Sequence, residues 1–334
     1  MSPSSTSLLR TPPMPAEGVR LGPSFDAARL LRELTAVREH TWDQQRVYSE
    51  DGVGAATEVD WRCLALRSPG GDGDRTDPGG PGPREFADTP WLDRIPYVRE
   101  VLESIPAPLH AVRFMALGPD TVGIDHNDPK YGPRWGVGRL HVPVVTNPDA
   151  VLVLDGVEHR WQPGEFWFGD FSRTHRVQNT GGEPRVHLVI DVLVTPGLAA
   201  LFPESWQEYF RDGEILFNRQ EVPQTADEHR RLGTTRFPLP ATFHLWEDAT
   251  PLEAEAPREL ATLTEAGDRM ALRLPGDRVF ALAHLGDHEY RLAGWSEERT
   301  LQVFPDGPDP RVVLRTREGG RVHQLTVTAE RLAA

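Results

Sequence analysis

The chain has 334 residues, of which 38% are hydrophobic and 26% are charged, and it is long enough for one large core plus a smaller second domain. Its net charge of −14 argues against a generic nucleic-acid binder, and no run of roughly 18 apolar residues predicts a transmembrane helix. The single cysteine, Cys63, excludes internal disulfides and a cysteine-based zinc cage, so any metal site must use His, Asp and Glu.

The first third of the chain is predicted to hold two helices and one strand. Residues 1–23 are rich in Pro and Ser and lack the pattern of a signal peptide, so we expect a disordered leader and a cytoplasmic protein. Apolar residues at helical spacing predict helices over 25–42 and 92–105, and 59–67 is expected to be a strand. The stretch 68–85 lacks the GK[ST] ending of a phosphate loop and is expected to be a flexible surface or lid loop.

The rest of the chain is dominated by short β-type runs. Between 112 and 194 these runs alternate in polarity and are separated by turn residues, which predicts an antiparallel barrel or sandwich. A helical segment is expected near 198–211. We therefore predict a mainly β protein with flanking helices, with a large domain over 24–215 and a small, mainly β C-terminal domain of unknown role over 236–334.

Three polar residues form a candidate metal site. His126 and Asp128 are two residues apart, so in an extended segment both side chains point to the same side. His175 follows a predicted strand further along the chain. Two histidines and one carboxylate make the facial triad of non-haem iron(II) oxygenases, which leaves coordination positions open. An H-x-D pair by itself is weak support, because a turn aspartate beside a surface histidine gives the same pattern.

Two arginines at strand positions strengthen this interpretation. Arg185 opens a strand in which it shares one face with His187 and Asp191, and Arg139 shares a face with His141. An arginine in a buried strand needs an anionic partner, and a dicarboxylate cosubstrate would supply one. A salt-bridged structural arginine is the alternative at either position.

The stretch 112–194 resembles the aspartyl/asparaginyl β-hydroxylase family, which includes bacterial hydroxylases of free amino acids. The resemblance covers roughly 25–195 and rests on these segments: WRCLALRSPGG (61–71), DTPWLDRIPYVREVL (88–102), DHND (125–128), GRLHVPVVTNPD (138–149), GEFWFGDFSRTHRVQN (164–179) and RVHLVID (185–191).

The resemblance implies a double-stranded β-helix core, also called a jelly roll or cupin-like fold. It implies a dioxygenase that uses Fe(II), 2-oxoglutarate and O₂, with the iron at the triad and 2-oxoglutarate held by Arg185. Arg139 and His141 match family positions near the other carboxylate of the cosubstrate. Some animal members lack the triad carboxylate, so Asp128 groups this chain with the bacterial members that have the full triad.

The substrate implied by the resemblance is an amino acid, free, within a peptide or bound to a carrier. The expected reaction is hydroxylation of an sp³ carbon, for example the β-carbon of an Asp- or Asn-type residue, with decarboxylation of 2-oxoglutarate to succinate. Arg67 and Trp135 are substrate-side candidates. No nucleic-acid or membrane partner is expected, and a homodimer is left open.

Two alternatives to an oxygenase stay open at this point. A non-oxidative metal-binding cupin, such as an isomerase or a sensor, could use the same His/Asp/His site, and a silent binding protein could use the same scaffold. Arg139 and Arg185 argue against the cupin, which has no need of a dicarboxylate clamp. A second histidine pair, His284 and His288, has the i, i+4 spacing of metal ligands on a helix, but its flanking sequence predicts strand and turn.

Overall fold

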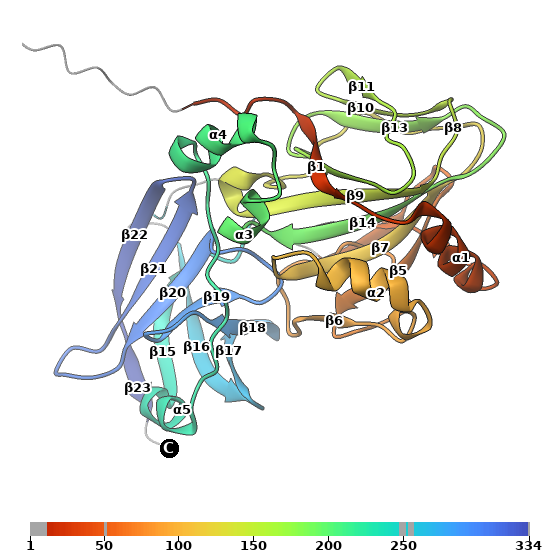
Figure 1. Ribbon diagram of the computed structural model, residues 1–334. Coiled ribbons are helices and arrows are strands. Elements are labelled where there is room, and N and C mark those ends of the chain that lie inside the picture. The colour runs from red at the N-terminus through yellow and green to blue at the C-terminus, as the bar shows by residue number, and fades with distance from the viewer. Residues whose placement is uncertain (1–11, 50–51, 247–251, 253–256, 333–334) are drawn as a thin grey trace, which may run out of the picture.

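The computed structural model describes residues 12–49, 52–246, 252 and 257–332. Figure 1 shows two β-rich bodies side by side, one drawn from red to green and the other from teal to blue. Within the described residues, no helix is long and apolar enough to cross a membrane.

Eight consecutive strands of the first body are divided between two antiparallel sheets. β12, β9, β14 and β7 are neighbours in the larger sheet, and β11, β10, β13 and β8 form the smaller one. This is the strand order of a jelly roll and confirms the predicted core. The bounds are β7 (Leu109–Leu117), β8 (Thr121–Val122), β9 (Val137–Val145), β10 (Ala150–Leu154), β11 (Val157–His159), β12 (Glu165–Gly169), β13 (His175–Asn179) and β14 (Arg185–Leu193).

Further strands extend the larger sheet at both of its edges. β1 (Gly18–Ser24) pairs with β12, so residues 18–23 are a strand and not part of a disordered leader; residues 1–11 of that predicted leader lie outside the described residues. The other strands are β5 (Trp61–Pro69), which pairs with β7, β2 (Asp43–Gln44) and β6 (Phe86–Asp88), which pair with β5, and the separate ribbon of β3 (Arg46–Ser49) and β4 (Gly52–Ala56).

Helices cover the outer face of the larger sheet. α1 (Ala27–Val37) and the pair η1 (Leu92–Arg94) and α2 (Pro96–Glu103) confirm the two predicted helices with shorter bounds. Their apolar faces share one core with outward residues of the sheet such as Leu140 and Ile190. Because side chains alternate along a strand, the residues next to these, including Arg139 and Asp191, point to the inside of the jelly roll.

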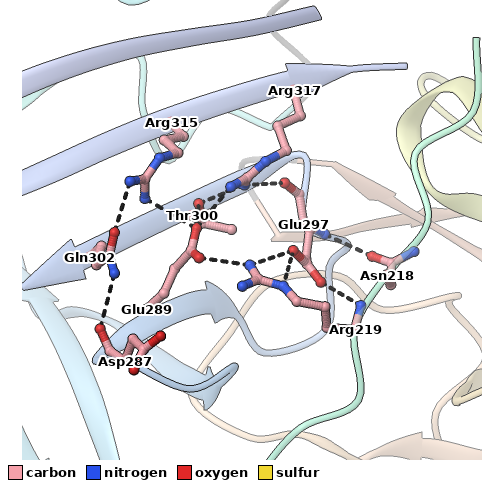
Figure 2. Close-up of polar contacts among 9 residues, drawn as sticks. All are labelled: Asn218, Arg219, Asp287, Glu289, Glu297, Thr300, Gln302, Arg315 and Arg317. Atoms are coloured by element: carbon pink, nitrogen blue, oxygen red, sulfur yellow. Dashed lines mark hydrogen bonds and ion pairs between the residues drawn. The ribbon is translucent and has the colours of Figure 1, made fainter. Parts of the chain in front are cut away.

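A helical segment and an extended linker lead to the second body. α3 (Pro196–Ala199), η3 (Glu204–Trp206) and α4 (Gln207–Asp212) account for the helical segment predicted near 198–211, and α5 (Ala226–Leu232) follows the linker. In the linker, the Asn218 amide donates to the Gly136 carbonyl at 2.7 Å and its oxygen accepts from the Glu297 backbone N–H at 2.9 Å. Arg219 binds Glu297 and Glu289 at 2.7 and 2.8 Å (Figure 2). The linker is therefore bonded to both bodies.

The second body is a meander that closes on itself. Each strand from β15 to β22 pairs with the next, and β23, which directly continues β22, returns to pair with β15. This confirms the predicted mainly β C-terminal domain. Its strands are β15 (Thr234–Pro240), β16 (Arg258–Ala266), β17 (Arg269–Leu274), β18 (Arg278–His284), β19 (Glu289–Leu292), β20 (Arg299–Phe304), β21 (Arg311–Glu318), β22 (Arg321–Thr328) and β23 (Glu330–Leu332).

The Gly- and Pro-rich stretch 68–85 lies between the two bodies. Thr76 and Asp77 are 6% and 4% exposed, and the Gly82 carbonyl accepts a hydrogen bond from the Ala281 N–H of the C-terminal domain at 2.8 Å. The expectation of an exposed surface loop is therefore wrong. Its alternative, a cover over a site, fits the position of this segment, as described next.

Candidate active site

The structure brings His126, Asp128 and His175 together at the mouth of the jelly roll. His126 and Asp128 lie between β8 and η2 (Pro133–Trp135), and His175 opens β13. An antiparallel bridge joins the two histidines, with N–H···O distances of 3.0 and 2.7 Å. One ligand atom from each of the three side chains lies within 4.8 Å of the other two. The three donors thus converge on one point, as a metal site requires.

Backbone carbonyls orient both histidine rings of the triad. His126 Nδ1 lies 3.0 Å from the Ile124 carbonyl, and His175 Nδ1 lies 2.9 Å from the Arg173 carbonyl. A ring that donates its Nδ1–H in this way keeps its lone pair on Nε2, and this second hydrogen bond is typical of metal-bound histidines. The donor set therefore fits an iron(II) ion with open positions.

Arg139 links the triad carboxylate to the interior of the jelly roll. Its guanidinium pairs with Asp128 on one side and with Asp191, at 2.6 and 3.2 Å, on the other. Burial raises the pKa of Asp128, but the charges of Arg139 and of the two triad histidines outweigh it, so this pKa stays below its ordinary value. The charge of Arg139 is therefore used within the protein, and its contact with a cosubstrate stays a prediction.

A cavity of about 100 Å³ opens beside the triad. Pro78 and Gly79 of the segment 68–85 close one side of it. Cationic and aromatic side chains form much of the remaining wall, among them Trp61, Arg113, Arg139, His141, Arg185 and Trp246.

Arg185 is buried in this cavity without a carboxylate partner among the described residues. It is 5% exposed, and the one polar contact recorded for its side chain joins Nη2 to His187 Nδ1 at 2.8 Å. Burial alone lowers the pKa of Arg185 to about 9. A buried guanidinium is costly unless an anion compensates it, so this residue fits the distal carboxylate of a dicarboxylate cosubstrate.

His141 continues the polar row that begins at Arg185. Its Nδ1 lies 3.3 Å from His187 Nδ1, which already faces the arginine, and its Nε2 is buried without a partner in the described part of the chain. Burial, followed by the positive charge of Arg185, holds the pKa of His141 well below its ordinary value. A neutral imidazole with one unused nitrogen can exchange a hydrogen bond with a ligand in the cavity.

Arg113, on β7, is a cavity residue that the sequence analysis missed. It is 2% exposed, its Nη2 lies 3.7 Å from Asp191, and its Nε and Nη1 have no hydrogen-bond partner in the described residues. The available signal was its position: a single arginine within the otherwise apolar run HAVRFMALG, on a strand buried on both faces. The cavity therefore contains a second guanidinium that can bind an anion.

Neither predicted substrate-side residue lines the cavity. Arg67 donates to the Leu109 carbonyl at 3.0 Å and pairs with Asp88 at 2.6 Å, so it holds strands together. Trp135 lies in η2 and belongs to a different surface hollow. The aromatic residues that do line the cavity include Trp61 and Trp246.

The C-terminal domain takes part in the site. Trp246 belongs to the segment after β15, and its ring lies 4.6 Å from that of Trp295 in the same domain. Lys130, two residues after Asp128, donates to Glu298 of the C-terminal domain at 3.0 Å, and both side chains are 5% exposed. The loop that carries two triad residues is thus fastened to the second body.

The sequence profile described as aspartyl/asparaginyl beta-hydroxylase matches residues 25–195. The chain belongs to this family. The aspartyl/asparaginyl β-hydroxylase match spans α1 to the end of β14 and includes the triad, Arg139 and Arg185. Its membership makes the chain an oxidoreductase of the 2-oxoglutarate-dependent dioxygenase type and decides against the alternatives of a non-oxidative cupin and a silent binding protein.

Solved structures similar to this family member have low identity. One is a 2OG-Fe(II) oxygenase family oxidoreductase from Burkholderia pseudomallei, with 11% identity, a TM-score of 0.35, and coverage of 53% of this chain and 84% of that one. Another is a prolyl hydroxylase from Trichoplax adhaerens, in complex with a hypoxia inducible factor peptide fragment, with 9% identity, a TM-score of 0.37, and coverage of 55% and 86%. No curated protein matches the chain.

Proposed function

We propose that this protein hydroxylates an sp³ carbon of an amino acid, free, within a peptide or bound to a carrier, and converts 2-oxoglutarate to succinate. The β-carbon of an Asp- or Asn-type residue is the example that the family suggests. The observation that carries the proposal is the presence, in one cavity, of a convergent His/Asp/His set and of the buried, uncompensated Arg185.

The roles of the chain's residues follow from this arrangement. His126, Asp128 and His175 would hold iron(II), and Arg185 would bind the distal carboxylate of 2-oxoglutarate, which orients the cosubstrate. When bound, iron and 2-oxoglutarate activate O₂, so that one oxygen atom enters the C–H bond of the substrate and the other enters succinate, with release of CO₂. Arg139 would fix the position of Asp128.

The substrate side of the cavity favours an anionic or strongly polar group. Arg113 has two unpartnered nitrogens there, and the Nε2 of His141 is also unpartnered among the described residues. Trp61 and Trp246 supply apolar wall. An amino acid has both a carboxylate for Arg113 and an aliphatic carbon to place near the metal, which supports this substrate class.

The proposal is tested by substrate screening together with an Arg185 variant. We expect one or more free amino acids or short peptides to stimulate succinate release in the presence of iron(II). Arg185→Met should raise KM for 2-oxoglutarate by roughly 10- to 100-fold, because one charge-assisted, bidentate contact is lost.

The matched control for this variant is Arg160→Met, since Arg160 is an exposed arginine that pairs with Glu158 and donates to the Pro148 carbonyl at the surface. It should leave KM for 2-oxoglutarate unchanged. An unchanged KM in Arg185→Met would contradict the cosubstrate role, and iron-dependent turnover without 2-oxoglutarate would contradict the reaction type.

A further inference from the structure

We propose that the C-terminal domain has a second metal site, formed by Glu228, His284 and His288, that takes a divalent transition metal ion of the zinc type. One ligand atom from each of these side chains lies within 4.8 Å of the other two. They come from α5, from the last residue of β18 and from the turn between β18 and β19. None of them lines the catalytic cavity.

His284 has the hydrogen bonding of a metal ligand. It is 5% exposed, and its Nδ1 lies 3.2 Å from the Val222 carbonyl. This contact leaves the lone pair on Nε2, and Nε2 is buried without a partner in the described residues. A buried nitrogen without a hydrogen bond costs free energy unless something binds it, and a cation among these three side chains would do so.

His288, the third member of this group, also has an unused ring nitrogen. Its Nδ1 is also buried and unpartnered among the described residues. Burial lowers the pKa of His288, with the charge of Glu228 acting in the opposite direction. Its backbone has a positive φ of 56°, which is uncommon for a residue other than glycine.

One carboxylate oxygen of Glu228 accepts hydrogen bonds, and the other is available to a ligand. Oε2 accepts hydrogen bonds from the backbone N–H and the hydroxyl of Thr225, at 2.7 and 2.8 Å, as the acidic member of a capping box. No hydrogen bond is recorded for Oε1 in the described part of the chain. The cap thus orients the carboxylate while its second oxygen remains for a ligand.

The turn that carries His288 is held in place before any ion binds. The Val303 N–H donates to the His288 carbonyl at 3.0 Å, and Gln302 donates to the Asp287 carbonyl at 3.1 Å. Figure 2 shows the neighbouring Glu289 held by several polar side chains, including Arg317 at 2.8 Å. A preorganised donor set binds a metal more tightly, because little ordering accompanies binding.

The donor types decide the class of ion. Two imidazoles and one carboxylate suit Zn²⁺ and similar transition metals better than Mg²⁺ or Ca²⁺, which prefer oxygen donors only. Three protein ligands leave one position for water. The ion would tie α5 to the β18–β19 turn within the C-terminal domain.

The test uses the full chain with the catalytic metal site removed by His126→Ala and His175→Ala. We expect this parent protein to bind about one equivalent of Zn²⁺, measured by competition with a chromogenic chelator, and to give the visible absorption of tetrahedral Co²⁺. Two further variants are chosen to keep the fold. Glu228→Gln retains the capping box, which accepts Gln at this position, and His288→Asn retains a residue that tolerates positive φ.

Each of these two variants should weaken Zn²⁺ binding by roughly 100-fold or more, since loss of a ligand costs at least as much as loss of a supporting contact. The control, His323→Ala, removes an exposed histidine of β22 in the same domain and should leave binding unchanged. A parent protein that binds no Zn²⁺, or binding that survives in both folded variants, would overturn the proposal.

Discussion

The two β bodies of this protein use their interiors in opposite ways. The inner face of the jelly roll carries charged and polar side chains, among them Arg113, Arg139, Arg185 and Asp191, and it keeps a cavity. The closed meander of the C-terminal domain is packed with apolar side chains from nearly every strand, with Phe237 as an example. Closure of a sheet therefore creates no ligand site by itself. The residues on the inner face determine whether a ligand site is present.

The same difference indicates that the C-terminal domain acts through its surface and not through its interior. An interior filled by its own side chains cannot receive a substrate. It reaches the candidate site through Trp246, which lines the cavity, and through Glu298, which binds Lys130 beside the triad. The apolar core of this domain also extends to Val137 of the jelly roll, so the two bodies share packing.

The largest effect expected is on catalysis, from the polar interior. His175→Ala should reduce substrate-dependent succinate formation by roughly 1,000-fold or more, because a metal ligand is lost, equivalent to about 4 kcal/mol of transition-state stabilisation. The fold should persist, since His175 opens a strand at the cavity mouth and is not part of an apolar core. Turnover retained in a folded variant would show that His175 is not a ligand.

A substitution in the filled interior of the C-terminal domain should affect stability and not activity. Phe237 is 1% exposed, so Phe237→Ala should lower the free energy of unfolding by about 3–5 kcal/mol. Leu260 is the matched control, because it lies opposite Pro238 on the neighbouring strand β16 and is 55% exposed. Leu260→Ala should change stability by less than about 0.5 kcal/mol in denaturant titrations. Equal losses in both variants would contradict the picture of a packed interior.

A substitution at the contact between the two bodies should have an intermediate effect on stability. Lys130→Met leaves Glu298 buried with one partner fewer, so we expect a loss of about 3 kcal/mol in stability, together with a raised KM for substrate. Arg211→Met removes an exposed ion pair and should cost less than about 1 kcal/mol. If Lys130→Met and Glu298→Gln together cost the sum of the single changes, the two side chains are not coupled.

The smallest effect expected concerns acid stability of the C-terminal domain. Burial raises the pKa of Glu289, but hydrogen bonds from Arg317 and other neighbours outweigh it and lower the pKa from 4.5 to about 2. Its contribution, reduced by solvent screening to about 1–2 kcal/mol, is therefore fully present above pH 4.5 and is lost as the pH falls toward 2. Glu289→Gln should flatten this acid limb in unfolding curves. If the unfolding curves of the unmodified protein and of Glu289→Gln superimpose at acidic pH, a stabilising role of Glu289 is contradicted.

The fold was largely predictable, because the polar and apolar alternation of each strand is set by which face it presents to a core. The segment 68–85 shows the limit of this reasoning. Its Gly, Pro and Asp content is typical of exposed loops, yet Thr76 and Asp77 are buried, since the C-terminal domain and this segment pack together. A contact between regions distant in sequence leaves no local pattern.

The candidate site was predictable where spacing carried the chemistry. An H-x-D pair, a distal histidine and strand alternation predict the three candidate ligands and Arg185, and the structure brings these four residues into one cavity. Arg67 is predicted at the substrate side, but its polar partners are strand carbonyls and Asp88. Arg113 and Trp246 were missed, since a lone arginine or tryptophan has the same local sequence whether it packs in a core or faces a ligand. Only the tertiary structure distinguishes these cases.

Lys130 gives the protein an internal reporter of domain separation. It is the only lysine in the chain, and its side chain is 5% exposed at the contact between the two bodies. Amine-reactive reagents can therefore modify a lysine side chain only when that contact opens. The rate of lysine acylation, followed by mass spectrometry, measures how often the C-terminal domain lifts from the loop that carries His126 and Asp128, without any label having to be engineered.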